Sequence, residues 1–264
     1  MGLLVLFMVG FCFILAFVEG ATGMIMPTPH QYGRVIIRNF SEQAGLGAVR
    51  FDHWLHRAFF TCRLCHVDIG FAMEANATKI KADTNMKGFY CGSCHNGTRV
   101  HKRRKIFASC SLSAVSVTNE GCRRCHSVGI NVQKEYDYVL FTEKLPRRGV
   151  GNLVDWEEAE ARGLIQPVDF LPGVSVERPP LTAQKDFSIP SGAWMSGIIF
   201  SHKKHALWNG CEVCHPDIFP SVKKGTLRYS MFQICDGQYC GVCHDHVAFP
   251  LRNCERCHAN PVRR

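Results

Sequence analysis

The pattern of hydrophobic and polar positions changes several times along the 264-residue chain. An uninterrupted apolar stretch runs from Leu3 to Val18, and the small residues Gly20 and Ala21 follow it. This pattern is typical of an export signal, so we expect residues 1–20 to be a signal peptide or, if retained, a membrane anchor. No comparable apolar run follows, which excludes a protein with several membrane spans.

Elsewhere the pattern predicts only short elements. The stretch QYGRVIIRNF favours a small hairpin near residues 30–40, and LVDWEEAEARGL favours a short helix with Asp155 as N-cap and Gly163 as terminator. The side chains that this helix should bury are Trp156, Ala159 and Leu164. Residues 167–192 are rich in proline and have no period, so we expect them to run extended and to pack on their own protein rather than on a partner.

Composition adds a cysteine signal. The chain is 46% hydrophobic and 11% aromatic, too much for a disordered chain, and it holds 15 cysteines and 13 histidines. Twelve of the cysteines fall into six copies of Cys-x-x-Cys-His, where chance would give about 0.04 copies. The copies are Cys62/Cys65/His66, Cys91/Cys94/His95, Cys122/Cys125/His126, Cys211/Cys214/His215, Cys240/Cys243/His244 and Cys254/Cys257/His258.

The spacing of this motif suits covalent haem. Two thiols three positions apart lie on one helical turn and can each form a thioether to a haem vinyl group, while the next residue supplies the proximal imidazole. Paired cysteines also build zinc sites, but zinc does not explain a histidine directly after every pair. We therefore expect six covalent haems c, each with the motif histidine as an iron ligand.

Charge must be judged with the haems in place. The chain has 31 basic and 22 acidic residues, a formal charge of +9, which alone would suggest an anionic partner. Six haems carry twelve propionates, which balance this excess. The basic residues are also scattered, so we expect no nucleic-acid partner.

The chain repeats internally. A shift of 149 positions lays residues 51–97 on 200–246 with 14 of 47 positions identical, every haem-attachment residue among them. The third motif breaks this register, because the first copy holds 17 extra residues before it. The repeat predicts the following organisation: extension 21–50, triheme module 1 at 51–126, linker 127–198, triheme module 2 at 199–258 and tail 259–264.

Each module opens with Phe-x-His-x-x-His, as FDHWLH and FSHKKH. Histidines three positions apart share one side of a helical turn and can reach two different irons. Free histidines are usually surface residues, but repetition at the same distance from the first motif favours distal ligands. The first histidine of each pair would serve the first haem of its module, and the second histidine the second haem. These ligands are His53, His56, His202 and His205.

The motifs resemble those of the triheme cytochrome c7 family, a shortened relative of tetraheme cytochrome c3. The residues that carry this resemblance are FDHWLH…CRLCHVDIG…GFYCGSCHNG…CRRCH and FSHKKH…CEVCHPDIF…GQYCGVCH…NCERCH. The resemblance implies electron transfer between closely stacked haems, mostly irregular structure with short α-helices and little β, and bis-His ligation of two haems per module. Small members place a histidine shortly before the second motif for the third haem, but Lys87 and Asp236 occupy these positions here.

The third haem of each module needs another distal ligand. Larger family members resemble this chain at an Ile/Tyr-x-Met segment, which makes Met231 the candidate in module 2. In module 1 the candidates are Met86, Met73 and His101. Cys235 of module 2, which aligns with Met86, could supply a thiolate instead, but we expect Cys235 and Cys110 to be buried free cysteines. Thioether ligation raises the haem potential relative to bis-imidazole ligation.

These features predict an exported hexahaem electron carrier rather than an enzyme. The rival is a multihaem reductase, which needs one haem with an open position and acid–base groups beside it. A third reading is a structural subunit of a membrane or filament complex. The expected partners are redox proteins or a membrane electron-transfer complex on the periplasmic or extracellular side, with membrane association possible through residues 3–18 and an oligomer or filament compatible with the same chemistry.

Overall fold

The structure, a computed structural model, describes residues 26–101, 103–110, 120–126, 136–179, 185–190, 195–220 and 228–259. The expected signal peptide or anchor at 1–20 lies outside the described residues, as does the tail after Ala259. In the part of the chain that is described, no helix combines the length and apolarity needed to cross a membrane.

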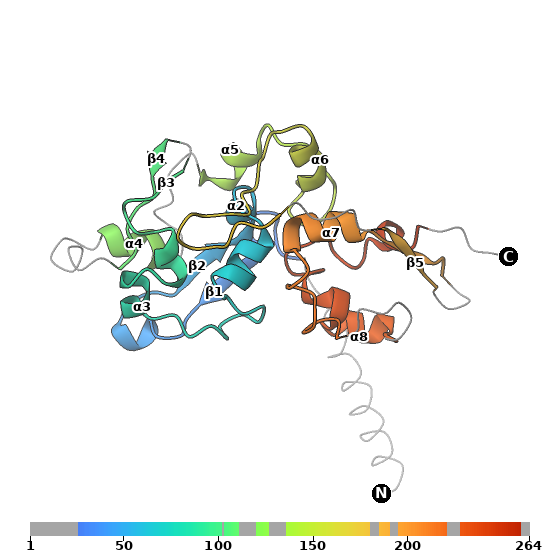
Figure 1. The fold of residues 1–264 in the computed structure, drawn as a ribbon, viewed down its shortest axis with the longest axis horizontal. Helices are drawn as coiled ribbons and strands as arrows, with labels where there is room; N and C mark the ends of the chain where they lie inside the picture. Colours follow the sequence, from blue (N-terminus) through green and yellow to red (C-terminus); the bar gives the residue numbers. More distant parts are fainter. Residues whose placement is uncertain are drawn as a thin grey trace, which may run out of the picture.

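The fold consists of short helices, three small hairpins and long irregular connections (Figure 1). The longest helix in the described ranges has eight residues, so the prediction of mostly irregular structure is confirmed. The strands are β1 (Arg34–Ile37), β2 (Val49–Asp52), β3 (Val100–His101), β4 (Arg104–Lys105), β5 (Phe187–Ile189) and β6 (Ile198–Phe200). The α-helices are α2 (His53–Arg57), α3 (Ala82–Met86), α4 (Glu120–His126), α5 (Tyr138–Thr142), α6 (Trp156–Ala161), α7 (His202–Asn209) and α8 (Met231–Cys235). Single 3-10 or π turns are η1 (Glu42–Ala44), η2 (Leu64–Asp68), η3 (Tyr90–Ser93), η6 (Tyr239–Val242) and η7 (Cys254–Arg256).

The prediction of a hairpin within residues 30–40 is wrong, because the second strand lies outside this range. β1 lies in that range, but it pairs with β2 in an antiparallel register that sets Arg34 opposite Asp52. The turn η1 and Gly45, which has a φ of +67°, reverse the chain between the two strands. Because β2 leads directly into α2, this hairpin fixes the start of the histidine-bearing helix of module 1.

The helix predicted around Trp156 forms as α6. Asp155 caps it by accepting a hydrogen bond from the Glu158 amide at 3.2 Å, and Gly163 ends it with a φ of +68°. The predicted burial of Leu164 is wrong, because Leu164 is 46% exposed while Ile165 is 5% exposed. The left-handed turn at Gly163 reverses the chain, which brings Ile165 rather than Leu164 to the core.

That core joins the linker to module 1. The buried side chains that form it are Trp54, Ala58, Val154, Trp156, Ala159 and Ile165. The linker then runs along module 1, where the amide of Val168 bonds the Phe59 carbonyl at 2.7 Å and the Thr61 amide bonds the Val168 carbonyl at 3.1 Å. In Figure 1, α5 lies above α2 of module 1, and α6 lies next to α7 of module 2. The described part of the linker therefore packs on its own protein.

Candidate haem-binding sites

A single large cavity runs through the described part of both modules. Its volume is about 2680 Å³, several times the roughly 300–1,000 Å³ of a pocket for one small molecule. Its lining includes the four predicted distal histidines and all motif cysteines and histidines except Cys122 and His126. The cavity thus has room for several large ligands beside the residues that are predicted to hold them.

The first motif runs into the π turn η2, and the third motif of module 1 lies in α4. In the other four motifs the histidine amide bonds back to the carbonyl of the first cysteine. The distances are 2.7 Å from His95 to Cys91, 3.0 Å from His215 to Cys211, 3.0 Å from His244 to Cys240 and 2.9 Å from His258 to Cys254. This i to i+4 bond sets the two thiols on one side of the turn and places the imidazole at its end. The local geometry is the one that the thioether interpretation requires.

Main-chain carbonyl groups orient eight of the ten histidines that are predicted to bind iron. Because a carbonyl only accepts, Nδ1 must donate and carry the proton, which leaves the Nε2 lone pair free to bind a metal. The bonds of the motif histidines are His66 to Phe71 at 2.9 Å, His126 to Gly47 at 2.7 Å, His215 to Phe219 at 2.6 Å, His244 to Phe249 at 2.9 Å and His258 to Ser196 at 2.7 Å. The bonds of the distal candidates are His53 to Gly33 at 2.7 Å, His56 to Asp52 at 3.2 Å and His205 to Ser201 at 2.8 Å.

The structure brings three of the four predicted distal histidines to a motif histidine. The ring centroids of His53 and His66 are 6.4 Å apart with the planes 4° from parallel. Two imidazoles that bind one metal from opposite sides, with metal–nitrogen bonds of about 2 Å, have ring centres about 6 Å apart. The other two pairs match this spacing and are His56 with His95 at 6.5 Å and His205 with His244 at 6.4 Å.

The fourth predicted pair does not form. Among the described residues, the ring of His202 has no contact with that of His215; it lies 4.9 Å from the Phe187 ring of strand β5 and 4.8 Å from that of Phe200. His202 still lines the cavity. Its assignment to the first haem of module 2 stays a prediction.

Burial keeps the paired imidazoles neutral. Removal from water lowers the pKa of His53, His56 and His95 to about 4, and it lowers the pKa of His205 and His244 as well. A neutral imidazole is the form that binds iron. Burial also raises the pKa of Cys243 to about 12, and the thiols of Cys62, Cys214 and Cys240 raise it further.

Two phenylalanines pack against the predicted distal histidines, a role that the sequence pattern did not predict. The ring of Phe51 lies 4.9 Å from that of His53 and 4.2 Å from that of His56, and Phe200 lies 4.8 Å from His202 and 4.5 Å from His205. In both modules the first contact is edge-on and the second is closer to parallel. The signal was present in the sequence as the first letter of Phe-x-His-x-x-His.

Comparison with known families now bears on these sites. The family model described as "Cytochrome c7 and related cytochrome c" matches residues 49–127 and 198–259, more than half of the chain. The chain belongs to this family. The c7-type matches coincide with the two stretches that hold the opposed histidines, the motif turns and the phenylalanine contacts.

Two solved structures are similar to this chain over most of its length. The C-terminal hexaheme fragment of GSU1996 is 21% identical, with a TM-score of 0.26, and the alignment covers 89% of this c7-type chain and 99% of the fragment. The N-terminal hexaheme fragment of GSU1996 is 20% identical, with a TM-score of 0.25 and coverage of 86% and 98%. No curated protein matches the chain.

The sulfur-bearing candidates for the third haem of each c7-type module differ in exposure and in whether they line the cavity. Met231 begins α8, is 44% exposed and lines the cavity, whereas Met86 ends α3, is 40% exposed and lies outside the lining. Burial raises the pKa of Cys110, and the adjacent thiol of Cys122 raises it further, so this cysteine lies beside the third motif of module 1. Cys235 is exposed. Met73 and His101 also line the cavity.

Proposed function

We propose that this c7-type cytochrome is an exported six-haem electron carrier. The observation that carries the proposal is the opposition of His53 to His66 at 6.4 Å with nearly parallel rings. A side chain that is only structural has no reason to face a second imidazole at the distance that an intervening metal requires. Bound haem c would supply an iron that exchanges single electrons.

The chain's own residues would hold and tune each group. In each motif the two cysteines would form the thioethers and the histidine would bind the iron. His53, His56, His202 and His205 would supply distal ligands, as would Met231 and Met86 at the third haem of each module. The carbonyl bonds to Nδ1 fix ring orientation, and an iron held by two protein side chains would have no free position for a substrate.

Export through residues 1–20 and redox proteins as partners belong to the same proposal. Covalent haem attachment and export together favour a location on the periplasmic or extracellular side. The basic excess of the chain would be mostly counter-charge for the propionates, so the proposal includes no nucleic-acid partner. Attachment to a membrane complex or assembly into a filament is compatible with it.

The first test is the intact mass of the native protein together with its spectra. We expect the mass of the chain plus six haems, which also reports whether residues 1–20 are present, and low-spin optical and EPR signals. A mass without haem would overturn the proposal. A high-spin signal that shifts on adding nitrite or cyanide would replace the carrier with a reductase.

Single substitutions then test the ligands. His53→Ala and His202→Ala should each create one high-spin haem if both histidines bind iron, while the exposed His30 offers a matched control in His30→Ala. Met231→Leu should abolish a methionine-to-iron absorption. If His202→Ala leaves the spectrum unchanged, His202 is not a distal ligand and the first haem of module 2 has another one.

A further inference from the structure

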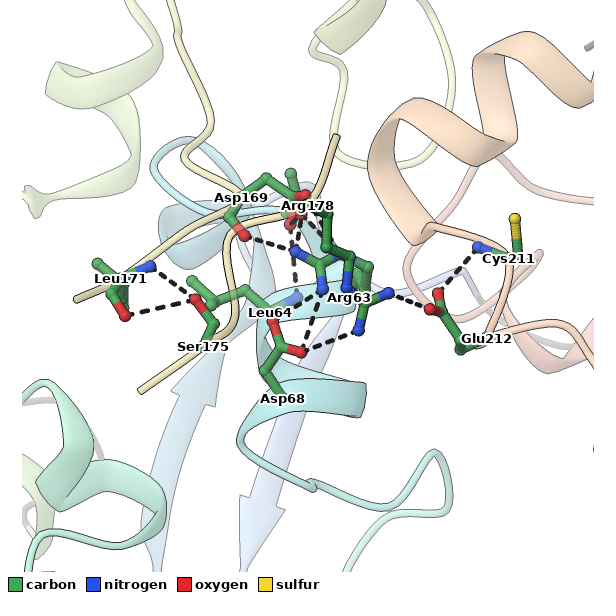
Figure 2. Close-up of polar contacts among 10 residues, drawn as sticks. Arg63, Leu64, Asp68, Asp169, Leu171, Ser175, Arg178, Cys211 and Glu212 are labelled. Carbon is green, nitrogen blue, oxygen red and sulfur yellow. Dashed lines mark hydrogen bonds and ion pairs between the residues drawn. The ribbon is translucent and has the colours of Figure 1, made fainter. Parts of the chain in front are cut away.

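Residues 168–178, called here the junction segment, contact the first motif of module 1 through Asp169 and that of module 2 through Arg178 (Figure 2). These motifs are CRLCH at 62–66 and CEVCH at 211–215. In each motif one charged residue follows the first cysteine, Arg63 in module 1 and Glu212 in module 2. These residues correspond in the internal repeat and carry opposite charges. The junction segment connects them through a chain of ion pairs.

Arg63 is the buried end of this chain. Its side chain is 2% exposed and its donors are filled on both sides. Nη1 donates to Asp68 at 2.9 Å, while Nε and Nη2 donate to the Asp169 carboxylate at 3.0 and 2.7 Å. A second bond from Nη2 reaches the Asp169 carbonyl at 2.6 Å. Such a fork of charge-assisted bonds fixes the junction segment to the first motif of module 1.

Arg178 continues the chain into module 2. It donates from Nη2 to Asp68 at 3.3 Å and from Nη1 to Glu212, whose other carboxylate oxygen accepts from the Cys211 amide at 3.1 Å. Glu212 therefore touches the motif backbone at the point where a haem would be attached. One arginine thus links the acidic residue beside the first motif of module 1 to the first motif of module 2.

Close packing accompanies the ion pairs. Gly210 directly precedes the module 2 motif, and a Cβ atom there would lie 2.4 Å from Cδ of Arg63. The two motifs thus meet directly as well as through the junction segment.

A second set of contacts supports this arrangement from the side of α6. The guanidinium of Arg57 lies 4.8 Å from the Trp156 ring and 5.2 Å from the Trp208 ring, so it sits between the linker and module 2. Trp208 also donates from Nε1 to Glu160 at 2.5 Å. Arg57 of module 1 and Trp208 of module 2 thus both contact helix α6 of the linker.

We propose that the junction segment locks the first haem-attachment motifs of the two modules side by side, with Arg178 as its positioning residue, so that electrons cross between modules at this contact. The inference rests on the proposed function for its second half. The rate of electron tunnelling falls steeply with distance, so a junction that held these motifs apart or let them separate would divide the carrier into two independent halves. The ion pairs of Arg63 and Arg178 hold the two modules at a fixed distance from each other.

The test uses the oxidised, haem-loaded full chain and three substitutions. Arg178→Gln and Glu212→Gln break the same contact from opposite sides, and Arg162→Gln is the control, because Arg162 is an exposed linker arginine that pairs within α6 to Glu158. Hydrogen exchange measures residues 59–69 and 204–215, and EPR records the magnetic coupling between neighbouring ferric haems. Intact mass counts the haems in each sample.

We expect Arg178→Gln and Glu212→Gln each to speed exchange about fivefold in both segments and to weaken the coupling, with no such change in Arg162→Gln. The double variant should be no worse than Arg178→Gln alone, since the contact that Glu212→Gln removes is one of the two that Arg178→Gln removes. Faster exchange confined to residues 172–178, additive effects or unchanged coupling would overturn the proposal. Missing haem mass would instead indicate failure of the proposed function.

Discussion

Modules 1 and 2 carry the same ligand pattern in different surroundings. In module 1, Trp54, which lies between the two predicted distal histidines in the sequence, is 3% exposed, whereas the matching residue of module 2 is Lys203, which is exposed. The rings of His53 and His66 face each other with their centroids 6.4 Å apart, but the ring of His202 does not face that of His215. The chemistry of the repeat is thus duplicated while its packing is not.

The difference comes from the linker. α5 and α6 pack on α2 of module 1 and bury Trp54 and Ala58, so module 1 acquires a protein core in addition to its cavity. α7 of module 2 meets the linker mainly through polar groups, such as Lys204 with Glu157. A triheme module can therefore keep its ligand-bearing turns with or without a conventional core beside them.

The largest effect should come from removing that core on one side only. Trp54→Ala should lower the free energy of unfolding by about 3–5 kcal/mol, because a fully buried indole leaves a cavity. Lys203→Ala, at the matched position, should stay within about 0.5 kcal/mol. Guanidinium unfolding of the haem-loaded protein measures both, and equal losses would mean that the two modules are packed alike.

A smaller loss should be shared by both modules. Gly92 and Gly241, each inside a second motif, would place a Cβ atom 1.9 Å from the carbonyl oxygen of Asn85 and of Ile234, respectively. Gly92→Ala and Gly241→Ala should each cost about 1–3 kcal/mol in thermal unfolding, since backbone must move. Gly149→Ala, where the space is open, is the control. A loss in one module alone would contradict the equivalence of the two turns.

The smallest difference concerns the helix before the second motif. Ser230 caps α8 by accepting from the Gln233 amide at 3.3 Å, while the matching residue before α3 is Lys81, whose side chain makes no such bond. Ser230→Ala should cost about 1 kcal/mol of unfolding free energy, and Lys81→Ala almost nothing. If both variants unfold at the wild-type denaturant midpoint, the cap does not stabilise α8.

The sequence predicted the features that depend on short spacings. The motif turns, the i, i+3 histidines of α2 and the cap of α6 at Asp155 all follow from residues within four positions of one another. The family match over residues 49–127 and 198–259 agrees with the predicted resemblance. In three of the four predicted pairs the two histidine rings lie opposite each other, while their role as iron ligands stays a prediction.

Features that depend on distant residues were missed. The partner of β1 lies beyond a turn that local pattern does not reveal, and Ile165 replaces Leu164 in the core because Gly163 reverses the chain. The ion pairs of Arg63 with Asp169 join positions more than 100 residues apart. No periodicity along the chain encodes such a contact, and only the folded linker brings its members together.

The main-chain anchoring of the imidazoles has an implication for how freely such a protein can vary. His66, His244 and His53 are held by the carbonyl oxygens of Phe71, Phe249 and Gly33, groups that every amino acid possesses. Mutation at an anchoring position can exchange the side chain without removing the acceptor, provided that the path of the backbone survives. The orientation of these imidazoles therefore depends on the path of the backbone and not on which side chains stand at the anchoring positions.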